Sequence, residues 1–548
     1  MKKNQLPGPA DWWRDAVVYQ IYPRSFADGN GDGIGDLKGI LSRVDYLASL
    51  GIDAVWLSPF FPSQLADGGY DVDDYQAIDE RIGTLAEFDE LVSKLHENQI
   101  RVFVDIVPNH SSNRHVWFKE ALEAGPGSAA RDRYIFRDGK GPDGSQPPSK
   151  LASHFGPEGW TRVPDGQWYM HLFTKEQPDF NWDNEEVHQY FLDTLRFWSD
   201  RGVDGFRIDV AHALKKNLEP LPDRDSYALS VMKDDGTDPI FDRDEVHEVY
   251  AAWREVFNEY DPPRVAVAEA WVHTNRRPPY ASANGLGQAF NFDLLASKWD
   301  AASFRKIITD NLEMSAETGS SSTWVMSNHD VIRHATRLAI PGYGESADGF
   351  SDEHRWYVEN RLNPNLDLDL GLARAKAATL LILALPGSSY IYQGEELGLH
   401  EVLDIPGESM QDPQWFRGEG KLKSRDGCRV PLPWTSAGSS YGFGKGGAHL
   451  PQPSWFAQVN VESQEAGDST LNLYRKAIAL RKASFSSDSL KWLNLGPNAT
   501  AFERDGIVCV TNFGEEGLEL PGGEVLLSSG AISSGKLPGN ATAWISTL

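Results

Sequence analysis

Eight short apolar runs recur along the chain, and stretches with helical periodicity separate several of them. Helical periodicity is clearest over residues 85–98 and 187–201. The apolar runs cover residues 17–22, 54–57, 102–107, 205–209, 265–269, 289–292, 324–326 and 389–392. Apolar runs that alternate with helices are typical of buried parallel strands in βα units. Eight such units predict an α/β fold, a closed (β/α)8 TIM barrel rather than an open doubly wound sheet.

Two segments interrupt this alternation and predict the domain organisation. Residues 111–178 are rich in Gly, Pro, Ser and aromatic residues and are too long for a bare loop, so we expect a small inserted domain after the third strand. A helix is expected at 470–482, and short alternating strands after it predict a C-terminal antiparallel β domain over residues 483–548. The barrel is then expected in two parts, residues 1–110 and 179–482.

The charge balance and the termini limit the partners and the compartment. The chain has 52 Lys and Arg residues against 79 Asp and Glu residues, and its net charge of −27 repels phosphate backbones and anionic lipid, so we expect no nucleic-acid or membrane partner. Only two cysteines occur, Cys428 and Cys509, which favours a reducing compartment. The N-terminal MKKNQLPGPADWW lacks the apolar run of a secretory signal. We expect a cytoplasmic monomer or small homo-oligomer.

Charged side chains and histidines lie near or just after the carboxyl ends of four of the apolar runs. They are Asp105 and His110 in DIVPNH, Arg207 and Asp209 in GFRIDV, Glu269 in VAVAEAW, and His329 and Asp330 in SNHD. The carboxyl ends of barrel strands meet at one face, where such barrels place their active sites. Cleavage of a glycosidic bond needs an acid to protonate the leaving oxygen and a carboxylate to meet the oxocarbenium-like carbon. The pattern supplies the groups that such a reaction needs.

Spacing assigns provisional roles to these residues. Arg207 and Asp209 are two residues apart on one strand and point to the same face, so the arginine is expected to keep the carboxylate ionised, as a nucleophile requires. Glu269 stands alone after an apolar run, which fits a general acid/base. Each residue by itself could be a structural or surface charge. Their repetition at successive strand ends favours catalysis.

These four stretches, in this order and with QPDFN as a fifth, resemble the signature regions of the α-amylase family, glycoside hydrolase family 13. The resemblance covers essentially the whole chain and is closest to the oligo-1,6-glucosidase and α-glucosidase branch. It implies a retaining glycosidase with Asp209 as nucleophile, Glu269 as general acid/base and Asp330 as the third carboxylate, which binds and distorts the sugar.

The same resemblance implies a pocket for one terminal glucose. His110, Arg207 and His329 would hold the ring, and Asp67 and Tyr70 in DGGY would bind and stack beneath it, although Gly68 stands where the family usually has Asn. The remaining candidates are Phe155, Phe173 and Gln177, which would line the pocket from the insertion, and Arg429 in RVPLPW, which would pair with Asp67. For the two phenylalanines and Gln177, packing within the insertion is an equal alternative.

An aspartate–arginine pair at the end of the pocket would leave room for one ring, which predicts exo-cleavage of short α-glucosides. Val210 after the nucleophile implies α-1,6 activity in this branch, although a valine also suits any buried strand. The following VAHALKK differs from the VINFI-like run of isomaltases, so α-1,4 activity stays open. The alternatives are a transglucosylase such as a sucrose isomerase or trehalose synthase, a non-enzymatic transporter heavy chain, and an amylase that acts on polymers.

The loop DGNGDGIGD places oxygen-bearing side chains at alternate positions, which suits a hard cation. Gly39 stands where an EF-hand would have its bidentate glutamate. The resemblance implies a structural Ca²⁺, which would serve stability and not catalysis; its ligands would be Asp28, Asn30, Asp32, Asp36 and the backbone carbonyl of Ile34. The alternative is a metal-free acidic turn.

Overall fold

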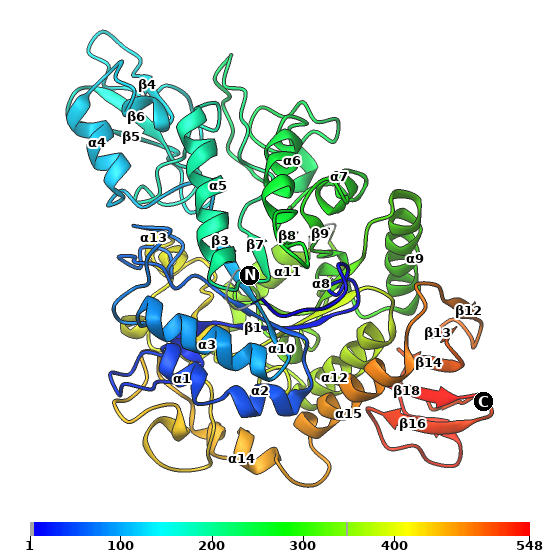
Figure 1. Ribbon diagram of the computed structural model, residues 1–548. Helices are drawn as coiled ribbons and strands as arrows, with labels where there is room; N and C mark the ends of the chain where they lie inside the picture. The colour runs from blue at the N-terminus through cyan, green and yellow to red at the C-terminus, as the bar shows by residue number, and fades with distance from the viewer. Residues whose placement is uncertain (1–4, 347–348, 548) are drawn as a thin grey trace.

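Eight parallel strands form the central sheet of the computed structural model, which describes residues 5–346 and 349–547 (Figure 1). The strands are β1 (Val17–Ile21), β2 (Ala54–Leu57), β3 (Arg101–Ile106), β7 (Gly205–Ile208), β8 (Val265–Ala268), β9 (Gly287–Ala289), β10 (Thr323–Val325) and β11 (Ser388–Tyr392). Their order is β10-β11-β1-β2-β3-β7-β8-β9, and a parallel bridge between Asn291 and Trp324 joins the two ends. The predicted TIM barrel is confirmed.

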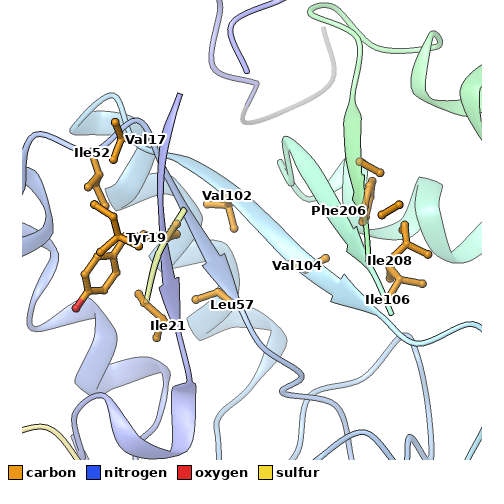
Figure 2. Close-up of a cluster of buried hydrophobic side chains, with 14 of the residues drawn as sticks. Val17, Tyr19, Ile21, Ile52, Leu57, Val102, Val104, Ile106, Phe206 and Ile208 are labelled. Carbon is orange, nitrogen blue, oxygen red and sulfur yellow. The ribbon is translucent and has the colours of Figure 1, made fainter. Parts of the chain in front are cut away.

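Along each strand, side chains point alternately toward the surrounding helices and into the barrel. In β1, Val17, Tyr19 and Ile21 belong to the large apolar cluster that packs against the helices, together with residues of β2, β3 and β7 (Figure 2). Val18 belongs to a second cluster, which includes Trp56 and Phe103. Successive side chains of a strand point to opposite faces. Residues with the parity of Val18, which include Gln20, Asp105 and Arg207, therefore point into the barrel.

Helices surround the barrel and begin at local capping signals. Thr84 and Glu87 form a capping box at the start of α3, and Asp300 and Asp367 cap α9 and α12. The helices outside the insertion are α1 (Leu37–Leu41), α2 (Val44–Leu50), α3 (Leu85–Glu97), α5 (Glu185–Asp200), α6 (Val246–Phe257), α7 (Pro278–Ala281), α8 (Asp293–Ala296), α9 (Ala301–Thr318), α10 (His334–Arg337), α11 (Gly349–Asn360), α12 (Leu368–Ala384), α13 (Pro413–Arg417), α14 (Val461–Gln464) and α15 (Thr470–Ser484).

Between β3 and β7 the chain leaves the barrel. It forms helix α4 (Val116–Ala124) and a three-stranded antiparallel sheet in the order β4-β6-β5, with β4 (Phe136–Asp138), β5 (Trp160–Arg162) and β6 (Gln167–Met170). Figure 1 shows this sheet projecting from the barrel on the side away from the C-terminus. Bridges from His110 to Asp179 and from Tyr134 to Phe180 bring the two ends of the excursion together.

The C-terminal strands form an antiparallel sheet, as predicted, in the order β12-β13-β14-β18-β16. The strands of this region are β12 (Lys491–Leu493), β13 (Ala499–Arg504), β14 (Ile507–Asn512), β16 (Glu524–Ser528) and β18 (Ala541–Ser546), with a separate pair β15 (Leu518–Glu519) and β17 (Lys536–Leu537). Helix α12 lies between this sheet and the barrel, and Trp544 Nε1 donates to the carbonyl of Leu380 at 3.1 Å. Within the described residues, none of the helices combines the length and apolar character that a membrane crossing requires.

Candidate active site

Arg207 is the centre of a buried charge cluster at the carboxyl ends of the strands. Its Nη1 atom lies 2.5 Å from Asp209 Oδ1 and 2.9 Å from Asp105 Oδ1, and its Nη2 atom lies 2.6 Å from Glu269 Oε2. The guanidinium is planar and presents its N–H groups as a rigid fork. One side chain of β7 therefore holds the predicted nucleophile and the predicted acid/base next to each other.

Glu269 receives two further hydrogen bonds. The indole Nε1 of Trp271 donates to Oε1 at 3.0 Å, and the backbone N–H of Val210 donates to Oε2 at 3.1 Å. Val210 makes this contact with φ at +45°, a left-handed conformation in which a β-branched residue is strained, at a typical cost of about 1–3 kcal/mol. The backbone after the nucleophile thus stores strain where it contacts the acid/base.

Three carboxylates contact the single guanidinium of Arg207. Burial raises the pKa of Asp209 well above its ordinary value; Arg207 opposes this shift, while Glu269 and Asp105 add to it. Burial likewise raises the pKa of Asp105 to about 7, against the influence of Arg207. The expectation that Arg207 keeps Asp209 ionised was therefore incomplete, because a single guanidinium is shared by three carboxylates.

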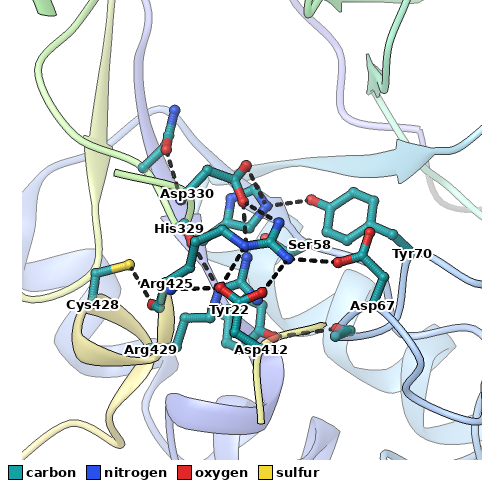
Figure 3. Close-up of polar contacts among 12 residues, drawn as sticks. Tyr22, Ser58, Asp67, Tyr70, His329, Asp330, Asp412, Arg425, Cys428 and Arg429 are labelled. Atoms are coloured by element: carbon teal, nitrogen blue, oxygen red, sulfur yellow. Dashed lines mark hydrogen bonds and ion pairs between the residues drawn. The ribbon is translucent and has the colours of Figure 1, made fainter. Parts of the chain in front are cut away.

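Asp330 lies in the opposite electrostatic environment (Figure 3). Its Oδ1 atom is 2.8 Å from Arg429 Nη2 and 3.1 Å from Arg425 Nη1, and its Oδ2 atom is 3.1 Å from His329 Nε2. Burial would raise the pKa of Asp330, but His329, Arg425 and Arg429 together hold it well below its ordinary value. Asp330 is accordingly ionised at neutral pH.

The partner of Asp67 is Arg425 and not Arg429, so the predicted pairing was wrong. Arg425 Nη2 lies 2.7 Å from Asp67 Oδ1 and 2.9 Å from Asp412 Oδ1. Arg429 instead bonds Asp330 and donates from Nε to the carbonyl of His329 at 2.8 Å. The two arginines stand four residues apart: Arg425 precedes the 3-10 turn at 426–429, and Arg429 is its last residue.

The remaining predicted ring-binding residues form a connected polar network. Tyr70 stacks on His329 with ring centroids 5.4 Å apart, and its hydroxyl lies 2.7 Å from His329 Nε2. Gln177 Nε2 lies 3.0 Å from His110 Nε2 and donates to Asp67 Oδ2 at 3.3 Å. Burial lowers the pKa of both His110 and His329 to about 3, so both rings are neutral at physiological pH.

Two phenylalanines from the insertion contact this network. Phe173 lies 5.1 Å from His110, ring centroid to ring centroid. The guanidinium of Arg425 lies over the ring of Phe155 at 5.3 Å. The structure thus brings together all twelve predicted catalytic and substrate-binding residues. Their individual roles stay predictions.

Comparisons with known proteins assign this arrangement to a family. A family model described as the alpha amylase catalytic domain matches residues 20–347 and 352–489. The chain belongs to the alpha-amylase family. It is 36% identical over 539 residues to a probable alpha-glucosidase of Rhizobium meliloti (strain 1021), covering 93% of this chain and 91% of that protein. It is 34% identical over 505 residues to the oligo-1,6-glucosidase of Parageobacillus thermoglucosidasius, covering 86% and 84%.

Solved structures give the same assignment. The alpha-glucosyl transfer enzyme XgtA superimposes with a TM-score of 0.81 at 33% identity, covering 97% of this chain and 99% of that chain. The trehalulose synthase of Pseudomonas mesoacidophila MX-45 superimposes with a TM-score of 0.82 at 30% identity, covering 98% and 100%. This member of the alpha-amylase family is a glycosidase, as the sequence predicted.

Sequence reasoning named Asp105 among the polar residues at strand ends but gave it no role, and it missed Arg425 and Gln20 as residues of this alpha-amylase site. Asp105 stands at the start of the DIVPNH motif, and its inward parity in β3 was a usable signal. Gln20 is a polar residue at an inward position of an otherwise apolar strand, which is also visible in the sequence. No signal in the sequence distinguishes Arg425 from Arg429.

The predicted calcium loop is organised by hydrogen bonds to backbone amides. Asp28 accepts from the N–H of Gly31 and Gly33, and Asp36 accepts from three N–H groups while capping α1. In the part of the chain that the structure describes, no three His, Cys, Asp or Glu side chains are grouped to hold a metal. The calcium stays a prediction, which a rise in melting temperature on adding Ca²⁺ to EDTA-treated protein would support.

Proposed function

We propose that this glycosidase is a retaining, exo-acting α-glucosidase that releases glucose from the non-reducing end of short α-glucosides. The observation that carries the proposal is the sharing of one guanidinium by Asp209 and Glu269. A retaining mechanism needs a carboxylate nucleophile and a second carboxyl group that are close enough to act on opposite sides of one glycosidic bond. The common contact with Arg207 supports such a proximity.

The proposed reaction has two displacements. Asp209 attacks the anomeric carbon while Glu269 protonates the leaving oxygen, which forms a covalent β-glucosyl-enzyme and frees the aglycone. Glu269 then takes a proton from water as the water oxygen attacks the same carbon and Asp209 leaves. Two inversions return the α configuration. Proton NMR of the sugar released at early times tests this step, and β-glucose as the first product would overturn it.

The exo preference is supported by the ion pair between Asp67 and Arg425. Both side chains are more than nine-tenths buried, and Arg425 also bonds Asp330. A charged pair beyond the nucleophile would meet the hydroxyls of a terminal glucose and would block an extended chain. Release of glucose from short α-glucosides before any fall in starch viscosity is expected. A rapid loss of viscosity without early glucose would contradict exo-cleavage.

The preferred linkage is proposed to be α-1,6, with α-1,4 activity in addition. The similarity to oligo-1,6-glucosidases and the presence of Val210 beside the nucleophile support this preference. Initial rates on isomaltose, maltose, kojibiose and sucrose, with products resolved, measure it. Replacing Val210 with threonine is expected to lower the ratio of isomaltose to maltose cleavage. An unchanged ratio would show that Val210 does not determine the linkage preference.

A second candidate is a transglucosylase or isomerase with the same carboxylates. It is favoured by the similarity to solved structures of an alpha-glucosyl transfer enzyme and of trehalulose and isomaltulose synthases. In that case a sugar hydroxyl replaces water in the second displacement. Incubation with sucrose or maltose at high concentration distinguishes the two: new disaccharides in excess of free glucose would establish transfer as the main reaction.

A further inference from the structure

Gln20 lies at an inward position of β1 and contacts His329 of the active site. Its side chain is buried, with 1% of its surface exposed. The amide Nε2 donates to Ser58 Oγ at 3.0 Å and lies 2.8 Å from Nδ1 of His329. The amide Oε1 has no hydrogen-bond partner among the described residues, so the nitrogen makes the contacts that orient this side chain.

The contacts of Nε2, the second ring nitrogen of His329, indicate which nitrogen of the imidazole carries the proton. Nε2 faces the Tyr70 hydroxyl at 2.7 Å and Asp330 Oδ2 at 3.1 Å. Asp330 is ionised and can only accept, so the contact with it requires an N–H on Nε2. The Tyr70 hydroxyl accepts from the same nitrogen and donates to Asp105 Oδ2 at 3.1 Å. A neutral imidazole has one N–H, and Nδ1 is therefore a bare acceptor facing Gln20.

We propose that Gln20 is a positioning residue of the active site: its Nε2–H group donates to Nδ1 of His329 and fixes the tautomer that presents an N–H to Asp330. The opposite amide orientation would place Oε1 against Nδ1 and draw the proton to that atom. The lone pair of Nε2 would then face the carboxylate of Asp330. Gln20 thus connects β1 to the third carboxylate without touching it.

Charged and titratable groups from several elements face the same ring. They are Asp330 beside it, Tyr22 from the end of β1, Tyr70, Arg207 from β7, and Arg425 and Arg429 from the segment after β11. Burial is the largest influence and keeps the ring neutral, and the three arginines act in the same direction. Within the residues that the structure describes, the Gln20 amide is the only group hydrogen-bonded to Nδ1.

The decisive variant is Gln20→Glu, which has the same shape but an acceptor in place of the donor. At low pH the new carboxylate stabilises a doubly protonated His329, which keeps its N–H on Nε2. At higher pH His329 loses one proton, keeps the other on Nδ1 against Glu, and presents a bare Nε2 to Asp330. We expect kcat/KM on an aryl α-glucoside to show an alkaline limb that the parent enzyme lacks.

Gln20→Met removes the donor without adding an acceptor. The tautomer is then free, and we expect kcat/KM to fall on the order of 10- to 100-fold with no new limb. The matched control is Gln393→Met. Gln393 is also fully buried, on the strand β11 side of the same barrel end, but its amide bonds only the main chain of Tyr22 and Ser25. This control is expected to keep the parent pH profile even if its melting temperature falls.

Nitrogen-15 NMR of histidine-labelled enzyme reads the tautomer directly and does not depend on turnover. The parent protein is expected to show His329 protonated at Nε2, and Gln20→Glu protonated at Nδ1 above the new limb. A parent ring protonated at Nδ1, or a Gln20→Glu pH profile parallel to that of the parent, would overturn the role of Gln20. Because the inference needs only glycosidase turnover, a β-anomer product would overturn the retaining mechanism and leave this result standing.

Discussion

The active site contains two charge clusters whose central groups have opposite sign. Around Arg207, three carboxylates share one guanidinium, and burial raises the pKa of Asp209 and Asp105. Around Asp330, two guanidiniums and a histidine contact one carboxylate, whose pKa is lowered. The first cluster tends to hold a proton, and the second to hold a fixed negative charge. The predicted catalytic carboxylates thus lie in two different electrostatic environments.

The two clusters contribute to stability with opposite dependence on pH. A carboxyl with a raised pKa, such as Asp105, contributes most below its unfolded pKa near 4, and this contribution is lost as pH rises through about 7. A carboxyl with a lowered pKa, such as Asp330, contributes above pH 4 and loses that contribution as pH falls. Asp→Asn variants at matched positions separate these effects.

The largest expected effect is on turnover by Asp209→Asn. The variant removes the nucleophile but keeps a side chain of the same shape, so kcat/KM on an aryl α-glucoside should fall by roughly four orders of magnitude or more. Steady-state kinetics measures this loss, and circular dichroism controls for folding. A variant that retains a few per cent of the parent activity would exclude Asp209 as the nucleophile.

The same Asp209→Asn change and Asp330→Asn should shift stability in opposite directions. Asp209→Asn relieves crowding of three carboxylates around Arg207, so the free energy of unfolding at pH 7 should rise. Asp330→Asn weakens hydrogen bonds to two guanidiniums, and the free energy of unfolding should fall by about 1.5–3 kcal/mol. Urea denaturation of both variants measures the pair. Shifts of the same sign would break the distinction between the two clusters.

Replacing each of the two arginines with lysine tests how the second cluster binds substrate. Arg425 bonds Asp67, Asp330 and Asp412, whereas Asp330 is the only carboxylate of the described residues that forms an ion pair with Arg429. Arg425→Lys should therefore raise KM for disaccharides by more than Arg429→Lys, because lysine cannot reproduce a forked contact with several carboxylates. Steady-state KM values for isomaltose compare the two. Equal increases would show that Asp67 needs no guanidinium partner.

The smallest expected effect is the pH dependence of Asp105→Asn. This variant removes the carboxyl with a pKa of about 7, so its stability relative to the parent should improve as pH rises from about 4 to 7. Above pH 7 the difference should level off. Melting temperatures of both proteins at matched pH values give the curve. A difference that stays constant with pH would place the shared proton on another carboxyl group.

Local patterns in the sequence were sufficient for the barrel and for most of the site. Seven of the eight apolar runs coincide closely with barrel strands, because strand periodicity and burial are expressed over a few neighbouring residues, whereas the run at 289–292 shares only Ala289 with β9. The carboxyl ends of those strands carry Arg207, Asp209, Glu269 and Asp330, and barrel closure brings such ends to one face. The fold and these four candidate residues therefore follow from short-range information, whereas the other pocket residues were implied by the family resemblance.

Tertiary structure alone decided which charges meet. Arg425 and Asp67 are 358 positions apart, and Gln20 and His329 are 309 apart, so no periodicity or spacing could pair them. The number of carboxylates on Arg207 also depends on three strands arriving together. Electrostatic energies fall with distance and with solvent exposure, and both are fixed only when the barrel closes and excludes water. The chain thus specifies which groups are available, and its folding determines their partners and their protonation.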